Sequence, residues 1–501
     1  MSQEAQKIAM TPQQGKPELI VIFESSAGVR AQSSPGMTAV ASSSGNDVSG
    51  VQSILSKHNA SLKLLFGPNE DRLRASLVAA SSTAQKIGQT PPDLTPFYSV
   101  QAAEDKLDQL AKELRAERTV KAAYVKPGAA PAIFAQPDKV STAAVASVTP
   151  NYQSRQSYLD PAPKGVDAAY ANSIVGGSGE RMKVCSVEFG WLFTHEDLME
   201  NQSGVIAGTA PVADNHGTAT VGIVGADKNP YGVTGIVPRA ISCASSVVDQ
   251  TVAAAIKNAA DKMSPGDIIF MSLHRPGPNT TGSGQFGFIA LEWWPDDFAA
   301  IKYATSKGII FVEAAGNGYQ NLDDPIYETA RAAYGFPSSY PNPFNTANPS
   351  SGAVIVGGGA PPEGTHGHSW WGPDRSRLAY SNYGSRVDCQ GQGYDVTTTG
   401  YGDLQGGGRP ELYYTDTFSG TSSATPIVAS ALCAAQGILK DFGRRPITGE
   451  ECRQLVRSTG SPQQDGLQGP KEGQRIGNRP DLRQLIPAAL KLTEWRPNAR
   501  L

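Results

Sequence analysis

The chain has 501 residues, with 43 Lys and Arg against 46 Asp and Glu, so its formal net charge is −3. This near-neutral balance excludes the strongly basic surface that nucleic acids or anionic membranes attract, and we expect neither as a partner. A content of 39% hydrophobic and 18% charged residues, with 53 Gly and 36 Pro, predicts a loop-rich globular protein of two or three domains.

The start of the chain lacks the features of a targeting segment. Residues 1–17 are polar, and the apolar stretch Leu19–Phe23 is shorter than the roughly 7–15 residues of a signal-peptide core. No uninterrupted apolar run reaches the roughly 18 residues that span a bilayer. We therefore expect no signal peptide or transmembrane segment. The protein would be cytoplasmic as synthesised, with leaderless secretion as the alternative. The five cysteines form no C-x-x-C pair, which favours core thiols over disulfides or a metal site.

Residues 1–128 carry a pattern of their own. It predicts strands at 18–23, 62–66, 97–100 and 121–125, a helix with Val51, Ile54 and Leu55 on one face, a second helix at 104–117, and loops at 42–50 and 81–92. The order β-α-β-β-α-β is that of a small ferredoxin-like domain. Residues 129–156 are rich in Ala, Pro, Ser and Val, which is the composition of a linker.

Residues 157–501 predict a second, larger domain. Its strands at 182–187, 240–248, 267–273 and 309–312 alternate with helices that begin at 215, 251 and 296. Such alternation predicts an α/β fold with a doubly wound parallel sheet and helices on both faces. In sheets of this kind the reacting groups gather at the carboxyl ends of the strands.

A serine lies at the start of a long apolar helix in the segment Gly420-Thr421-Ser422-Ser423-Ala424-Thr425-Pro426. The first turn of a helix lies in its positive field, so the N–H of Ser422 is available to a developing anion. An ordinary N-cap serine is the alternative interpretation of this segment.

Two further segments place polar side chains beside predicted elements. His216 opens a helix whose Gly217, Ala219 and Gly222 allow close backbone approach. Asn317 follows an apolar strand, where a neutral amide donor can stabilise an oxyanion, although Asn-Gly is also a common turn.

In combination these segments resemble the subtilase family of serine endopeptidases, over about residues 160–439. Val187-Glu188-Phe189-Gly190 with His195-Glu196-Asp197-Leu198 resembles the family's first catalytic block, and Gly232–Pro238 resembles the block after the histidine helix. The resemblance implies a subtilisin-like fold that hydrolyses peptide bonds in proteins or peptides.

The resemblance also implies a role for each matching residue. Ser422 would be the nucleophile, His216 the general base, and Glu188 the carboxylate that orients His216. Asn317 and the Ser422 N–H would form the oxyanion hole. The resemblance also implies that substrate would be bound by Ser272, Leu273 and Gly316.

Two positions depart from the family pattern. Glu188 stands where the family has aspartate, so a catalytically inactive, peptide-binding relative is one alternative, and an esterase or acyl-transferase is another. His274 stands where glycine is usual, and it would place a side chain at the rim of the primary specificity pocket.

The resemblance has further implications for the whole chain. Domain 1–128 resembles an inhibitory propeptide, with an independent accessory domain as the alternative, and 129–156 would contain the processing site between it and the catalytic domain 157–501. We therefore expect a self-processing zymogen, monomeric and inhibited by its own N-terminal domain. No cofactor is needed for the chemistry, and Asp197 and Asn229 match positions that would hold a structural Ca²⁺.

Overall fold

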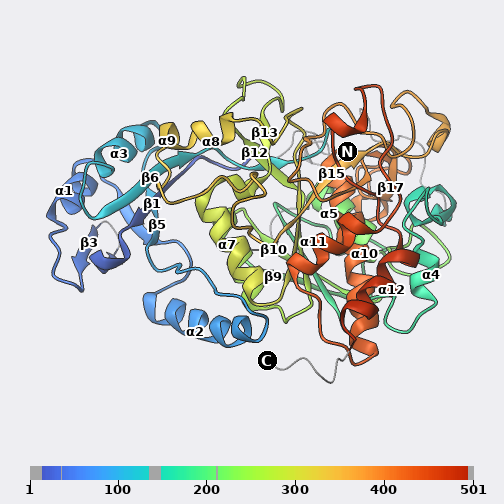
Figure 1. Cartoon of the computed structure of the whole chain (residues 1–501), viewed down its shortest axis with the longest axis horizontal. Coiled ribbons are helices and arrows are strands. Elements are labelled where there is room, and N and C mark those ends of the chain that lie inside the picture. Colours follow the sequence, from blue (N-terminus) through green and yellow to red (C-terminus); the bar gives the residue numbers. More distant parts are fainter. Residues whose placement is uncertain (1–13, 35–36, 135–147, 210–212, 495–501) are drawn as a thin grey trace.

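The computed structural model describes residues 14–34, 37–134, 148–209 and 213–494 (Figure 1). A smaller N-terminal domain lies at one end of a larger α/β domain. Most of the predicted linker, residues 135–147, lies outside the described residues.

The N-terminal domain is an antiparallel sheet with two helices on one face and a third helix packed toward the larger domain. Its elements are β1 Glu18–Phe23, β2 Val29–Ser34, β3 Met37–Ser42, α1 Ser49–Lys57, β4 Ser61–Leu64, α2 Glu70–Lys86, β5 Phe97–Gln101, α3 Leu107–Leu114 and β6 Val120–Lys126. The four-stranded sheet has the order β4-β5-β1-β6, and β2 and β3 form a separate hairpin. Leu19, Val21 and Phe23 of β1 pack with α1 and α3, while Ile20 and Ile22 face the larger domain.

Two elements of this domain differ from the sequence prediction. The hairpin β2–β3 was not predicted, and the expected loop 81–92 begins inside helix α2, which ends at Lys86. The buried face of α2 consists of Leu73, Ala80 and Ala84. Because two of these side chains are alanines and the exposed face also carries Ala75, Val78 and Ala79, the helical period has little apolar contrast.

The larger domain contains a seven-stranded parallel sheet of order β16-β15-β14-β11-β8-β10-β9. Its strands are β8 Lys183–Glu188, β9 Gln202–Ala207, β10 Ile241–Ser246, β11 Ile268–Met271, β14 Ile310–Ala314, β15 Val354–Gly359 and β16 Cys389–Gln392. The predicted strand 267–273 is divided, because a second short strand, β12 Leu273–Pro276, leaves the sheet and pairs elsewhere.

Helices cover both faces of the parallel sheet, as the alternating pattern predicts. The helices of the larger domain are α4 Ala168–Asn172, α5 Asn215–Gly225, α6 Val252–Asp261, α7 Pro295–Ser306, α8 Ile326–Thr329, α9 Arg331–Tyr334, α10 Thr421–Asp441, α11 Gly449–Ser458 and α12 Leu482–Leu492, of which the short α8 and α9 lie away from the sheet. Along β11, Ile268 and Phe270 belong to the core with α5, α10 and α12, whereas Ile269 and Met271 belong to the core with α6 and α7. Successive side chains of a strand point to opposite faces, so one apolar run supplies both cores.

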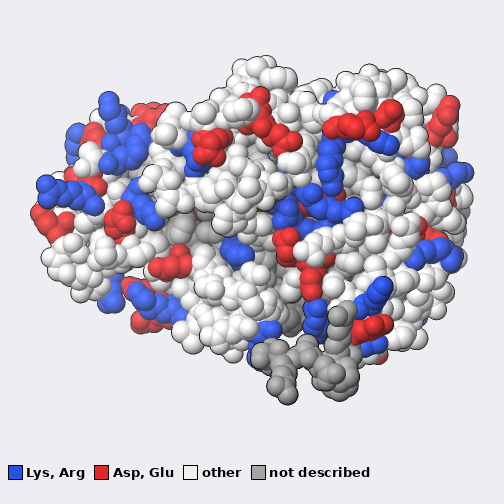
Figure 2. Space-filling model, in the orientation of Figure 1, with Lys and Arg blue, Asp and Glu red and all other residues white. Residues whose placement is uncertain are grey.

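Helix α10 packs against strands β11, β14, β15 and β16 of the parallel sheet. It is long and apolar enough to cross a membrane by length and composition, but the whole of its apolar window is buried inside the protein. The five cysteines are also buried and unpaired, in agreement with the prediction of core thiols. Both signs of charge are interspersed on the face of the molecule in Figure 2.

The two domains meet through a buried cluster of charged side chains. Lys126, at the end of β6, bonds Asp296 at 2.5 Å and Asp297 at 2.9 Å in the first turn of α7. Tyr124 donates to Asp296 at 2.9 Å. Burial opposes the charge of Lys126, but the carboxylates of Asp296, Asp297 and Glu18 outweigh it and raise the lysine's pKa.

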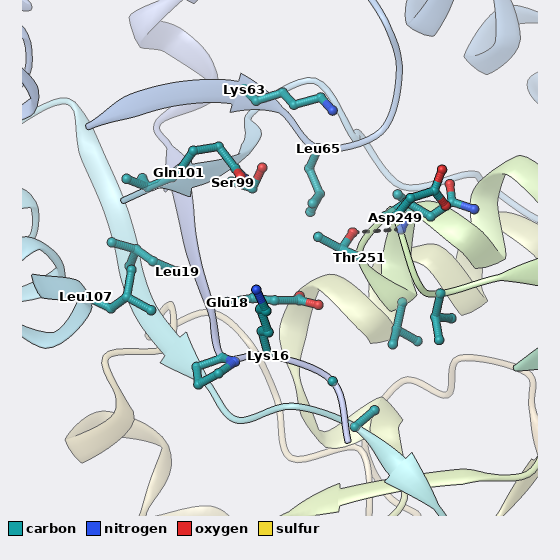
Figure 3. A pocket seen from close by; sticks show the side chains of 18 of the residues that line it. Lys16, Glu18, Leu19, Lys63, Leu65, Ser99, Gln101, Leu107, Asp249 and Thr251 are labelled. Carbon is teal, nitrogen blue, oxygen red and sulfur yellow. Dashed lines mark hydrogen bonds between the residues drawn. The ribbon is translucent and has the colours of Figure 1, made fainter. Parts of the chain in front are cut away.

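A cavity of about 670 Å³ also lies between the two domains. Lys63 and Leu65 line it from the N-terminal domain, and Asp249 and Thr251 line it from the start of α6 (Figure 3). None of the candidate site residues lines this cavity, so it is separate from the reacting groups.

Candidate active site

Three elements of the larger domain bring the predicted reacting groups together. Glu188 is the last residue of β8, His216 lies in the first turn of α5, and Ser422 lies in the first turn of α10. All three side chains are buried, with 1%, 4% and 0% exposure. The site therefore lies at the carboxyl edge of the sheet, where the alternating fold predicts it.

The three side chains form a continuous hydrogen-bonded chain. His216 Nδ1 lies 2.7 Å from Glu188 Oε2, and His216 Nε2 lies 2.8 Å from Ser422 Oγ. The second carboxylate oxygen of Glu188 accepts from the N–H of Phe189 at 2.8 Å. Glu188 therefore fixes the orientation of the imidazole, and its own orientation is fixed by its neighbour's backbone.

Burial is the main influence on the ionisation of Glu188. It raises the carboxyl pKa above its usual value, while the neighbouring His216 opposes that rise. The other carboxylate near the histidine, Asp214, has a different role: it caps α5 and accepts from the N–H of His216 at 2.6 Å. Of these two described carboxylates, Glu188 is the one that bonds a ring nitrogen of His216.

Two donors converge on one carbonyl oxygen beside the serine. The Ser422 N–H donates to Ala132 O at 3.1 Å, and Asn317 Nδ2 donates to the same oxygen at 2.6 Å. Asn317 is held by its own Oδ1, which accepts from the N–H and the hydroxyl of Thr421 at 3.0 and 2.8 Å. This geometry is that of an oxyanion hole with a peptide carbonyl in it.

The occupant of the site is the chain's own segment after the N-terminal domain. The short strand β7 Ala130–Pro131 pairs antiparallel with β12, with Pro131 opposite Leu273, and the Ala132 N–H donates to Ser272 O at 2.9 Å. Figure 1 shows the chain running from β6 of the N-terminal domain toward β12. Ser272 and Leu273 thus contact the chain's own segment, and their binding of substrate stays a prediction.

Glycines allow this close approach of two backbones. Gly420 has a φ of 93°, and a Cβ added there would lie 2.1 Å from Ala132 O. Gly316 has a φ of 94° and directs the chain into Asn317, but its own close neighbours are Asn382 and strand β13 (Phe288–Ile289) rather than the bound segment.

Gln285 is a contact residue that the sequence analysis missed. Its side chain accepts from Asn317 Nδ2 at 3.0 Å and donates to Ile133 O at 2.7 Å. It therefore links the oxyanion donor to the residue that follows Ala132. Gln285 lies in a glycine-rich loop with no periodic pattern, and no signal in the sequence distinguishes it.

Comparison with known proteins shows which family has this arrangement of residues. The family model Peptidase_S8, described as the Subtilase family, matches residues 194–478, which contain His216, Asn317 and Ser422 and begin after Glu188. The chain belongs to the subtilase family.

Among its relatives, this subtilase is 27% identical to subtilisin NAT of Bacillus subtilis subsp. natto over 291 residues, which are 55% of this chain and 61% of that one. It is 28% identical to thermitase of Thermoactinomyces vulgaris over 313 residues, which are 58% of this chain and 86% of that one. The match therefore spans less than two thirds of the first relative.

Two solved structures share the fold of this subtilase over 96% of its length, each at 16% identity. Fervidolysin from Fervidobacterium pennivorans, a keratinolytic enzyme related to subtilisin, has a TM-score of 0.52 and is covered over 62% of its chain. The epidermin leader peptide processing serine protease (EpiP) from Staphylococcus aureus has a TM-score of 0.50 and is covered completely. At this identity the likeness concerns the fold alone.

His274, at the position where the subtilase pattern has glycine, turns its side chain inward. It is fully buried, its Nδ1 accepts from the N–H of Asn317 at 3.2 Å, and its ring packs edge-on against Phe288 at 4.7 Å. Burial lowers the pKa of His274 to about 3, so the ring stays neutral and Nδ1 stays an acceptor. The histidine thus fills space beside the oxyanion residue and helps to fix it.

The predicted calcium residues of this subtilase lie together but bond each other. Asp197 accepts from Asn229 Nδ2 at 2.7 Å, and its other oxygen accepts from Val233 N and from the Tyr414 hydroxyl. Asn229 Oδ1 is used by the N–H of Tyr231. Both carboxylate oxygens already have protein donors, and among the described residues no three His, Cys, Asp or Glu side chains gather as a metal site. Asp197 and Asn229 are thus engaged in hydrogen bonds within the protein, and calcium binding by them stays a prediction.

Proposed function

We propose that this subtilase is a serine endopeptidase that first cuts its own chain between Ala132 and Ile133. The observation that carries the proposal is the Ala132 carbonyl oxygen, bound by Ser422 N and Asn317 Nδ2 beside the Ser422 hydroxyl. Family membership supports the endopeptidase activity, and the self-cleavage site falls within the predicted processing region 129–156.

In the acylation step, Ser422 Oγ attacks the carbonyl carbon of Ala132 while His216 Nε2 takes the hydroxyl proton. The oxygen of Ala132 becomes an oxyanion stabilised by its two donors. Collapse of this intermediate breaks the Ala132–Ile133 bond. His216 then gives its proton to the nitrogen of Ile133, which leaves as a new amino terminus, and Ala132 remains as an ester on Ser422.

In the deacylation step, water donates a proton to His216 Nε2 and its oxygen attacks the ester carbon. The ester bond to Ser422 breaks, and the proton returns from His216 to Ser422 Oγ. Ala132 leaves with a free carboxylate. Throughout, Glu188 keeps Nδ1 protonated and stabilises the imidazolium, so that Nε2 is the nitrogen that faces the serine.

We further propose that the N-terminal domain inhibits the processed enzyme. The strand order β4-β5-β1-β6 supports the ferredoxin-like arrangement expected for such a domain. The Lys126 cluster and the seating of β7 on β12 support a domain that stays bound and keeps the cleft occupied after the cut. The alternative, an independent accessory domain, does not account for the pairing of β7 with β12 at the site.

No cofactor is assigned to the chemistry in this proposal, because the residues already described account for each proton. The calcium site at Asp197 and Asn229 stays a prediction. Thermal unfolding with calcium and with a chelator tests it, and equal midpoints would count against a cation there.

The test of the proposed function compares the wild-type chain with Ser422→Ala by intact mass and N-terminal sequencing. We expect wild type to yield a new N-terminus beginning Ile133-Phe134, and Ser422→Ala to stay at full length. Trimming of the alanine variant at the same bond would remove Ser422 from the nucleophile role.

A fluorophosphonate probe separates the two alternatives. An inactive peptide-binding relative would not be labelled at Ser422. An esterase or acyl-transferase would be labelled and would turn over simple esters, but it would leave protein substrates and the Ala132–Ile133 bond intact.

A further inference from the structure

An aromatic side chain of the bound segment lies in a cluster of tyrosines. Phe134, the second residue after the proposed cut, stacks on Tyr380 with ring centroids 4.4 Å apart and planes 17° apart. Tyr394 meets it edge-on at 5.8 Å, and Tyr319 meets it edge-on at 6.4 Å. Offset-stacked and edge-to-face contacts at these distances are the favourable arrangements of aromatic pairs.

Two of the three tyrosines are buried in the protein, and the third, Tyr319, lies exposed at the edge of the cluster. Tyr380 is fully buried and its hydroxyl donates to Gly393 O at 2.5 Å. Tyr394 is 8% exposed, and Trp370 packs against its outer side at 4.7 Å. The positions of the two buried rings are therefore set by the fold of the enzyme.

The cluster is also held in register with the reacting serine. Gly393 O, which accepts from Tyr380, accepts from the N–H of Gly420 at 2.9 Å as well, two residues before Ser422. On the substrate side, Gln285 holds Ile133 O. A chain whose carbonyl lies in the oxyanion hole thus reaches the tyrosines with the side chain two residues beyond the cut.

We propose that Tyr319, Tyr380 and Tyr394 form a leaving-side subsite that takes an aromatic side chain two residues after the cleaved bond. This inference rests on the proposed function and specifies the substrates of the same site. Aromatic pairs contribute about 0.5–1.5 kcal/mol beyond area burial, so an aromatic residue should raise kcat/KM roughly two- to thirteenfold over a branched aliphatic one.

The test uses processed enzyme that carries Phe134→Ala and has been separated from its N-terminal domain, so that neither the domain nor the new N-terminus competes for the site. Quenched-fluorescent peptides contain Ala-Pro-Ala-Ile followed by Phe, Tyr, Leu or Ala. We expect kcat/KM to fall in the order Phe or Tyr, then Leu, then Ala, with the cut after the second alanine in each peptide.

Tyrosine variants locate the effect. Tyr319→Ala and Tyr380→Leu should reduce the Phe-to-Leu ratio toward one, whereas Tyr380→Phe keeps the ring and should keep the ratio. Phe442→Ala is the matched control, because Phe442 is an exposed aromatic residue that follows the far end of α10. If Tyr380→Leu fails to fold, Tyr319→Ala still gives the answer, since Tyr319 is 41% exposed.

The outcomes distinguish the two proposals. If no peptide is cut, the proposed function fails. Equal cleavage of all four peptides overturns the subsite alone, and so does a preference for Phe that persists in both Tyr319→Ala and Tyr380→Leu.

Discussion

Substitutions of Glu188 can distinguish two contributions of this residue to activity. One is the orientation of the His216 ring by a hydrogen bond, and the other is the negative charge beside that ring. In Glu188→Gln, one end of the amide must face the N–H of Phe189 and the other must face His216 Nδ1. Because the carbonyl oxygen is the only acceptor, keeping the bond to Phe189 turns the NH₂ group toward Nδ1. The imidazole would then carry its proton on Nε2 and could not accept one from Ser422.

The size of this effect follows from the buried geometry. Amide-for-acid replacement in another triad protease lowers the rate about 10⁴-fold, which is about 5.4 kcal/mol in the activation barrier. Glu188→Asp keeps the charge but withdraws the carboxylate by one carbon–carbon bond, about 1.5 Å, from a contact of 2.7 Å. Displacements of about 1 Å can cost about 10²-fold, so Glu188→Asp should fall between wild type and Glu188→Gln.

The assay is kcat/KM on an Ala-Pro-Ala-Ile-Phe peptide, with the rate of fluorophosphonate labelling as a second readout. Asp214→Asn is the matched control, because asparagine can still cap α5 while one partly buried carboxylate near His216 is removed. We expect that control to stay within about tenfold of wild type, far above Glu188→Gln. A Glu188→Gln enzyme with nearly wild-type activity would refute the role of Glu188, and Asp214 would then be the carboxylate to test.

The remaining predictions concern the oxyanion hole, the domain contact and a buried histidine. Asn317→Leu removes one of two donors to the Ala132 oxygen and should lower kcat about 10²–10³-fold with little change in KM; a loss under tenfold in steady-state kinetics would contradict the oxyanion role. Lys126→Met leaves Asp296 buried without its cation, while Asp297 keeps Arg275, so it should reduce the free energy of unfolding by about 3–5 kcal/mol in the uncut Ser422→Ala background, and an unchanged denaturation midpoint would count against the cluster as a domain contact. His274 has its pKa lowered to about 3 in the folded protein, so the unfolded state binds the extra proton below pH 6.5 and stability is lost as the pH falls; between pH 7 and pH 5 this loss should be about 2 kcal/mol larger in the Ser422→Ala protein than in the same protein with His274→Asn, and equal losses would contradict a buried neutral ring.

The sequence determined the elements and the types of the reacting groups. Strands such as β8, β11 and β14 were predictable because strands buried on both faces appear as short apolar runs. The segment Gly420–Pro426 allowed us to predict that Ser422 lies at a helix start. Its residue types meet two local requirements, close approach of another backbone and the initiation of a helix. Helix α2 escaped prediction because its buried alanines resemble its exposed face.

Only the tertiary structure decided which of these groups meet. His216 reaches a carboxylate 28 residues away and a serine 206 residues away, and no local pattern encodes such distances. The same holds for Ala132, whose carbonyl oxygen lies on an amide donor 185 residues further along the chain. His274 and Gln285 gained their roles in the same way, because a contact between distant segments depends on strand order, crossover direction and loop path. Strand order, crossover direction and loop path are set by how the two cores pack, and the pattern of neighbouring residues in the sequence does not encode that packing.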